Sequence, residues 1–213
     1  MSGTEDIVIV GMARTPMGGL LGELSHLSAP ELGAIAVKAA MKDAKAEGAD
    51  QIIMGNVLSA GQGQAPARQA ALGAGLAKST EAVTLNKMCG SGLQAVVMAR
   101  QALLTGEADV IVAGGMESMS RAPFLMPNHR LGRKYGHDKV LDHMAYDGLE
   151  DAYEGLAMGV YADQAAKEYQ FTRQMQDTYA LETLRRAQSA GAEGRFKREI
   201  APLETKVGII ATD

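Results

Sequence analysis

The sequence predicts an α/β fold with a mostly parallel β-sheet. Short, continuous apolar runs alternate along the chain with alanine-rich segments of helical periodicity, which is the pattern of strand–helix–strand units. Hydrophobic residues make up 46% of the chain and 25 residues are glycine, so packed layers are expected rather than disorder. A chain of 213 residues can bury a substantial core in one or two domains.

The segments before the single cysteine are expected to alternate between strands and helices. The continuous apolar run Ile7–Val10 is typical of a strand that is buried on both faces. Apolar residues recur at helical spacing over 30–45, with Ser28 or Ala29 near the start of this helix and Gly48 after its end. The other expected elements of this part are a loop at 14–19, a strand at 52–58 and a helix at 66–76.

The chain's only cysteine, Cys89, lies between an expected strand and an expected helix. Val83–Leu85 have the character of a strand end, and the almost wholly apolar segment from Leu93 to Leu104 predicts a buried helix. The intervening Cys-Gly-Ser-Gly permits a tight turn and the close approach of another group to the backbone. A cysteine at a helix N-terminus is favoured as the thiolate, which is the nucleophilic form. A further strand is expected at 109–115.

A purely structural role for Cys89 is the alternative, because a lone cysteine is commonly buried and inert. The two glycines that follow favour the nucleophile. A structural cysteine does not need them, whereas a nucleophile that accepts a bulky group does.

Composition and charge argue against several classes of function. The formal net charge of −4 and the 4% aromatic content do not suit a nucleic-acid-binding protein. One cysteine excludes an intrachain disulfide and suits a reducing compartment. No apolar run approaches the length of a membrane span, and residues 1–6 lack the basic start of a targeting signal, so a cytoplasmic location is expected.

Neither a metal nor another cofactor is expected. His129, His137 and His143 show no i,i+4 partner and no nearby thiolate, so they do not form a metal-binding pattern. The glycines at 18–22 and 61–63 do not match the dinucleotide-binding fingerprint after a strand.

The character of the chain changes after Ser120. Residues 121–143 carry five Lys or Arg side chains, three of the four histidines and two prolines. This composition fits either a solvated surface loop or a contact with another subunit or a ligand phosphate. Farther on, an amphipathic helix is expected over 172–190 and a strand or extended segment over 199–207.

Four motifs, in order, resemble the thiolase family of acetyl-CoA acetyltransferases and 3-ketoacyl-CoA thiolases. Leu85–Ala95 is similar to the family's nucleophile segment. Ala13–Gly19, Gly114–Ser120 and Gly155–Gly159 are similar to other segments of its first half. The resemblance covers nearly all of this chain but only the N-terminal half of a thiolase.

The resemblance implies a thiolase-like layered α/β fold in two domains. Residues 1–120 would form the N-terminal α/β domain, with a mostly parallel sheet, the nucleophile and a buried helix. Residues 121–213 would form part of an inserted loop domain that covers the acyl pocket. Within it, the resemblance favours contact between subunits for 121–143, and hence a homo- or hetero-oligomer.

The resemblance also implies the chemistry of an acyltransferase in fatty acid metabolism. Cys89 would accept an acyl group from a coenzyme A thioester, followed by Claisen condensation, or by thiolysis in reverse. The Cys89 backbone N–H would be one donor to the thioester oxyanion. Met158 would lie against the acyl group, and Ala157 stands where some thiolases have a histidine. Coenzyme A thioester is the substrate, and no cofactor is implied.

The family's activating histidine, its second oxyanion hole and its second cysteine belong to the C-terminal half, so this chain is expected to be inactive alone. Three interpretations remain open. The chain is the nucleophile half of a thiolase that needs a complementary half or subunit, a non-catalytic assembly subunit of the same fold, or part of another condensing enzyme such as a ketoacyl synthase. Asn86-Lys87 before the cysteine and Gly114–Ser118 favour the thiolase.

Overall fold

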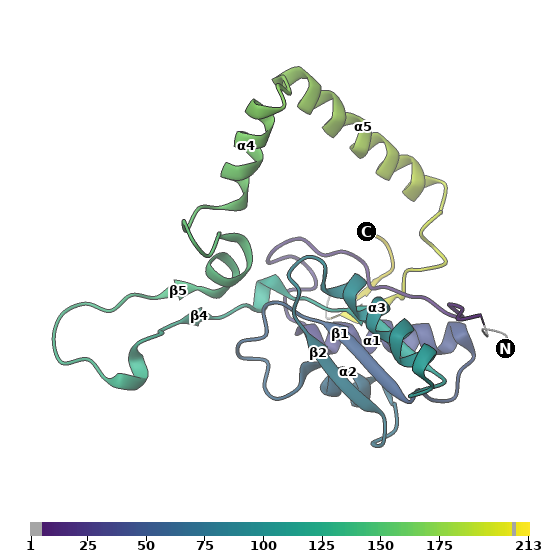
Figure 1. Ribbon diagram of the computed structural model, residues 1–213. Coiled ribbons are helices and arrows are strands. Elements are labelled where there is room, and N and C mark those ends of the chain that lie inside the picture. Colours follow the sequence, from purple (N-terminus) through teal and green to yellow (C-terminus); the bar gives the residue numbers. More distant parts are fainter. Residues whose placement is uncertain (1–5, 206–207) are drawn as a thin grey trace. The chain divides into compact units, whose positions relative to one another are not determined.

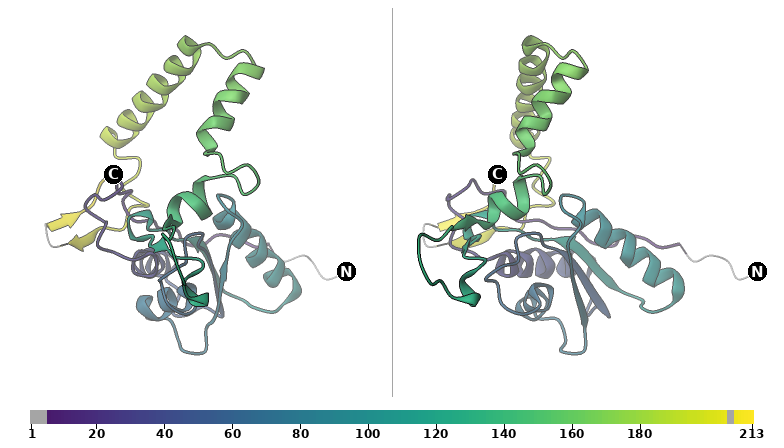
Figure 2. Two further views of the ribbon diagram at one scale, coloured as in Figure 1. Left: turned by 90° about the vertical axis from the view of Figure 1, so that its left-hand side faces the viewer. Right: turned by 60° about the vertical axis from the view of Figure 1, so that its left-hand side comes forward.

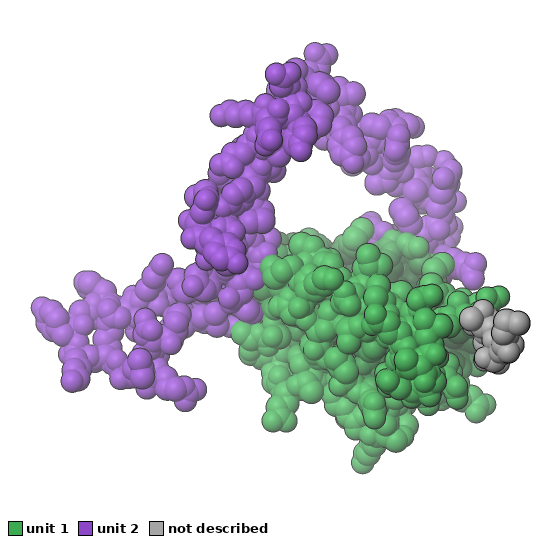
Figure 3. Space-filling model, in the orientation of Figure 1, with its two compact units in different colours: residues 1–122, 199–211 green, residues 123–198, 212–213 purple. Residues whose placement is uncertain are grey.

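The computed structural model describes residues 6–205 and 208–213 and contains two compact units. Unit 1 consists of the described residues within 1–122 and 199–211, and unit 2 of residues 123–198 and 212–213 (Figure 3). The domains expected from the sequence run consecutively, whereas residues 199–211 return to unit 1. Arg14 connects this returning segment to the start of the chain. Its Nε donates to Glu199 Oε1 at 2.7 Å and its backbone N–H donates to the Glu199 carbonyl at 2.8 Å. Its carbonyl accepts from the Ala201 N–H at 2.7 Å.

Unit 1 is built on a three-stranded parallel sheet with the strand order β2-β1-β3 (Figure 1). The strands are β1 (Gln51–Gly55), β2 (Glu81–Leu85) and β3 (Ile111–Gly115). The helices are α1 (Ala29–Ala44), α2 (Pro66–Ala74) and α3 (Ser91–Thr105). The alternation of strands and helices therefore gives the predicted α/β fold with a parallel sheet.

The central strand β1 is buried on both faces, and this divides the core into two layers. Its side chains alternate between the faces, as they do in any strand. Ile52 and Met54 pack with α1 and α2, whereas Ile53 packs with α3 through Ala95 and Ala99. Helix α3 therefore covers one face of the sheet, opposite α1 and α2.

Two expectations about buried apolar segments are wrong. No strand forms at Ile7–Val10, and Ile9 is 83% exposed, because no described strand pairs with this run. Helix α3 is buried only toward the sheet. Its outer face exposes apolar side chains, with Leu93 73% exposed, because no described segment packs on it.

The second sheet of unit 1 is the antiparallel pair β6 (Leu203–Thr205) and β7 (Gly208–Ile210). The extended segment predicted over 199–207 therefore contains a strand. Lys206 and Val207, which also belong to that prediction, lie outside the described residues, as do Met1–Glu5. A 3₁₀ turn, η1 (Met119–Arg121), completes this unit.

Unit 2 contains short strands and two longer helices. Its elements are β4 (Phe124–Leu125), η2 (His129–Leu131), β5 (Leu141–Asp142), the π-helix η3 (Ala145–Leu149), α4 (Met158–Glu168) and α5 (Arg173–Ala192). The helices α4 and α5 diverge from the turn that joins them (Figure 2). Among the described residues of this unit only His143 is buried, so the apolar faces of both helices are open.

The sequence-based statement that His143 lacks an i,i+4 partner is wrong. Its Nδ1 lies 2.5 Å from Asp147 Oδ2, at i+4, and the two residues flank the start of η3. Residues four apart on a helical segment meet on one side of it, which explains the contact.

Helix α1 begins with a capping box, as the serine near its expected start suggests. Ser28 Oγ accepts from the Glu31 backbone N–H at 3.4 Å, and Glu31 Oε2 accepts from the Ser28 N–H and Oγ–H at 2.7 Å each. These bonds satisfy N–H groups that a helix start otherwise leaves without partners. The Ser28 hydroxyl, followed by its backbone N–H, lowers the pKa of Glu31 below 4.5.

We predict that Ser28→Ala lowers the free energy of unfolding by about 1 kcal/mol at pH 7. Because the folded-state pKa of Glu31 is depressed, its contribution is present above pH 4.5 and is lost as the pH falls through the lowered value. The difference between wild type and variant should therefore narrow at pH 3. Denaturant unfolding at both pH values checks this, and a difference that stays constant or widens in acid would contradict it.

Candidate active site

The candidate nucleophile Cys89 lies in a tight turn between β2 and α3. Strand β2 ends at Leu85, α3 begins at Ser91 with Gly90 as its N-cap, and Cys89 is exposed to solvent. Met88 adopts φ = 49°, a left-handed conformation that is rare for a residue with a side chain. A strained residue directly before the cysteine is typical of a turn that aims a side chain.

Ser91 fixes this turn through its side chain. Its Oγ accepts from the Lys87 N–H at 2.9 Å and donates to the Met88 carbonyl at 2.5 Å, and the residue is only 5% exposed. Asn86 Oδ1 accepts from the Met88 N–H at 2.9 Å. Sequence reasoning identified the glycines around Ser91 but missed its own role. The signal was present, because a serine at an expected helix start commonly hydrogen-bonds to nearby backbone groups.

Gly55 allows the first turn of α3 to lie directly on the end of β1, and Gly115 at the end of β3 lies at ordinary contact distance from the same turn. A Cβ on Gly55, the last residue of β1, would lie 2.6 Å from Ser91 Cβ and 2.9 Å from its carbonyl carbon. A Cβ on Gly115, the last residue of β3, would lie 3.7 Å from Gly92 Cα. The contact places Cys89 at the carboxyl edge of a parallel sheet, where α/β folds bind ligands, and at the positive end of a helix dipole.

Met158, the predicted acyl-pocket residue, is the first residue of α4 and is 48% exposed. It belongs to unit 2, whereas Cys89 belongs to unit 1, and each unit is described by itself. Ala157 precedes it as the N-cap and makes no side-chain capping bond. The segment before Met158 closes on itself, because the Asp151 N–H donates to the Leu156 carbonyl at 2.8 Å.

Tyr161 holds this segment from the following turn of α4. Its hydroxyl donates to Glu154 Oε2 at 2.9 Å. Partial burial, followed by this bond, raises the pKa of Tyr161 to about 12. Asp151 accepts the Glu154 and Tyr153 N–H groups, and the Glu154 bond is the main cause of its lowered pKa.

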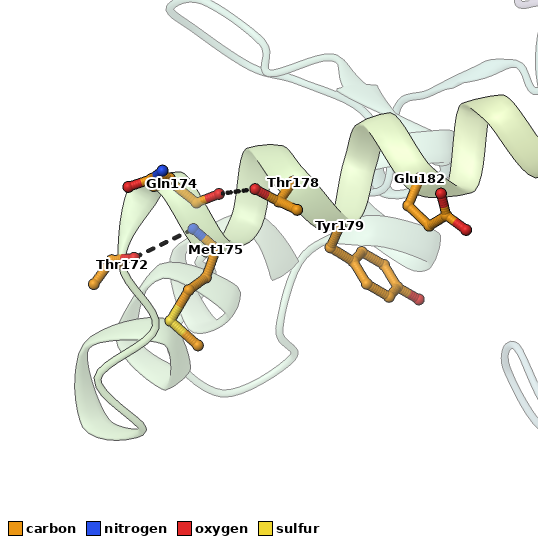
Figure 4. A pocket seen from close by; sticks show the side chains of 6 residues that line it. All are labelled: Thr172, Gln174, Met175, Thr178, Tyr179 and Glu182. Atoms are coloured by element: carbon orange, nitrogen blue, oxygen red, sulfur yellow. Dashed lines mark hydrogen bonds between the residues drawn. The ribbon is translucent and has the colours of Figure 1, made fainter.

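A hollow of about 530 Å³ lies along the first turns of α5 in unit 2 (Figure 4). It is lined by Thr172, Gln174, Met175, Thr178, Tyr179 and Glu182. Thr172 caps the helix, accepting from the Met175 N–H at 3.2 Å, and Glu182 accepts from Arg185 and Arg186. Thr172 and Glu182 therefore make their hydrogen bonds with residues of the same helix.

Within residues 6–205 and 208–213, no cluster of three or more His, Cys, Asp or Glu side chains is arranged to hold a metal ion. None of the helices in the same residues combines the length and apolar character needed to cross a bilayer.

Comparison with known proteins identifies a family match. Residues 7–210 match the model of the thiolase N-terminal domain. The chain is 49% identical over 205 residues to acetyl-CoA acetyltransferase 2 of Arabidopsis thaliana, and the aligned region covers 95% of this chain and 51% of that protein. It is 46% identical over 207 residues to the acetyl-CoA acetyltransferase of Saccharomyces cerevisiae, covering 95% of this chain and 52% of that protein.

The corresponding enzyme of Cupriavidus necator is 48% identical over 200 residues, which is 93% of this chain and 51% of the relative. The chain thus spans about half the length of the curated relatives it matches.

We predict that Gly55→Ala destabilises unit 1 by about 1–3 kcal/mol, because the added methyl group would overlap the backbone of Ser91. Gly48→Ala is the matched control. Nothing lies within 4 Å of a Cβ at Gly48, so its effect should stay within about 0.5 kcal/mol. Denaturant unfolding of both variants checks the contact, and equal stabilities would disprove it.

Proposed function

The chain belongs to the thiolase family, and from this premise we propose that it is the nucleophile half of an acetyl-CoA acyltransferase. The single observation that carries the proposal is Cys89, the only cysteine, exposed in a fixed turn at the start of α3. The acetyl-CoA acetyltransferases that match nearly the whole chain support the choice of substrate, a coenzyme A thioester.

In the proposed reaction, the Cys89 thiolate attacks the thioester carbonyl. A new bond forms between the Cys89 sulfur and the acyl carbon, and CoA leaves as a thiolate that takes up a proton. The carbanion of a second acetyl-CoA then attacks the acyl-cysteine, which releases the Cys89 thiolate and 3-ketoacyl-CoA. Thiolysis is the reverse sequence. The Cys89 backbone N–H is proposed as one donor to the oxyanion, because it lies at the helix N-terminus.

Met158 is proposed as a contact of the acyl group. A flexible thioether at the exposed start of α4 can adapt to an apolar substrate, and the neighbouring Ala157 adds no polar group. A reducing compartment such as the cytoplasm is proposed as well, since the reactive thiol must stay reduced.

The chain is proposed to act with a complementary polypeptide that supplies the acid–base residues. The outer face of α3 supports this, because Leu93, Val96, Val97 and Leu104 form an exposed apolar stripe. The sheet edges at β2 and β3 also lack a further strand among the described residues. Uncovered apolar stripes and sheet edges favour association over a stable monomer.

The hairpin of β4 and β5 is proposed as a contact between subunits. The segment that joins its strands exposes large apolar side chains, among them Leu131 and Tyr135, the latter 96% exposed. It also carries several cationic residues, of which Arg133 pairs with Asp138 at 2.6 Å. Homo- and hetero-oligomers both fit this surface.

The second candidate is an assembly subunit without chemistry, which the uncovered face of α3 also supports. The two functions differ in what Cys89 does. An assembly subunit needs the fold and the apolar face but not the thiol.

We predict that the chain alone does not cleave acetoacetyl-CoA, and that a C-terminal thiolase half restores turnover. Cys89→Ser should then lower the restored rate by about 10⁴-fold or more, because a serine hydroxyl is far harder to deprotonate than a thiol. The loss of absorbance of enolised acetoacetyl-CoA on adding CoA measures the rate. Gly48→Ala keeps the thiol and serves as the control.

If the chain is instead an assembly subunit without chemistry, no turnover is expected even after the C-terminal half is added. Full turnover by the 213-residue chain, with mass spectrometry excluding a second polypeptide, would contradict the proposed division of the catalytic residues.

A further inference from the structure

Glu117, two residues after β3, binds the segment that follows β1. Its carboxylate accepts the Val57 N–H at 2.8 Å, the Leu58 N–H at 3.2 Å and the Asn56 side-chain amide at 2.8 Å. A carboxylate that accepts several N–H groups holds them more firmly than a neutral acceptor would. The loop after β1 is therefore fixed to the end of β3.

Asn56 extends this connection to β2. Its backbone N–H donates to the Leu85 carbonyl at 3.0 Å, and its side-chain Nδ2 donates to the Met116 carbonyl at 3.1 Å. Leu85 is the last residue of β2, four residues before Cys89. Asn56 and Glu117 thus join the carboxyl ends of all three strands, at the edge of the sheet from which the Cys89 turn departs.

The orientation of the Asn56 amide is set by its partners, at a cost. Both groups that Nδ2 contacts are acceptors, so the amide cannot be turned over. Its Oδ1 is buried without a donor among the described residues, and Asn56 is 3% exposed. A buried acceptor without a protein partner is unfavourable, and the two bonds of Nδ2 offset this cost and hold the amide in one orientation.

We propose that Asn56 and Glu117 are positioning residues for Cys89, holding the end of β2 and hence the turn that carries the thiol. The inference rests on the proposed role of Cys89 as the nucleophile. Ser91 fixes the turn from the α3 side, and the Asn56–Glu117 pair fixes it from the strand side. If the strand ends separate, the cysteine leaves the N-terminus of α3 and reacts as an ordinary thiol.

The test compares the rate of Cys89 alkylation by iodoacetamide in variants of the 213-residue chain. Glu117→Gln keeps the shape of the side chain but replaces one carboxylate oxygen by an NH₂ group. This donor would face N–H groups that now donate to the carboxylate. Asn56→Leu keeps the branched shape and removes the amide. Thr80→Val is the matched control. Thr80 is 2% exposed and donates to the Ala49 carbonyl at 2.7 Å, just before β2 begins.

We expect Cys89 alkylation to be slowed about fivefold or more in Glu117→Gln and in Asn56→Leu. Each substitution breaks hydrogen bonds of one network, and contacts within one network are energetically coupled. Thr80→Val should alkylate at the wild-type rate although it also loses stability in denaturant unfolding. Wild-type rates in the first two variants, or an equal slowing in Thr80→Val, would overturn the proposal. If Asn56→Leu does not fold, Glu117→Gln decides.

The alkylation rate does not depend on acyl transfer, so the two proposals fail separately. A chain that alkylates as expected but never turns over with a C-terminal half would refute the proposed function and leave the positioning role intact.

Discussion

The contact between the first turn of α3 and the carboxyl ends of β1 and β3 is the constraint on which the candidate site depends. It exists because Gly55 carries no side chain where the end of β1 meets Ser91, and a Cβ there would lie only 2.6 Å from Ser91 Cβ. A helix start held this close to the sheet leaves only a short turn after β2. Cys89 therefore emerges at the helix N-terminus, in a position set by the sheet rather than by a flexible loop.

The same geometry leaves the chain with uncovered surface. Helix α3 uses Ala95 and Ala99 against the sheet and presents Leu93 and Val97 outward. In unit 2, both helices expose their apolar faces. These surfaces agree with a chain that spans about half the length of its relatives, and they support the proposal that further polypeptide completes the fold and its chemistry.

Local signals predicted the α/β fold and the strand–turn–helix unit around Cys89, whereas they did not reveal the long-range contacts. Ser28 marked a helix start, and the glycines around Cys89 marked a strand–turn–helix unit, because these features depend on neighbouring residues. The run Ile7–Val10 predicted a strand that has no neighbour to pair with, since apolar character does not specify a partner. The Asn56–Glu117 contact joins residues 61 positions apart, which no local pattern reveals.

The most direct measurement for Cys89 as the acyl acceptor is peptide mapping by mass spectrometry. The chain would be mixed with a C-terminal thiolase half and acetyl-CoA, quenched in acid and digested. One acetyl group should be found on the peptide that contains Cys89, and it should disappear when CoA is added before the quench. Acetylation of a different residue, or an unmodified Cys89 in an assembly that turns over, would contradict the central claim.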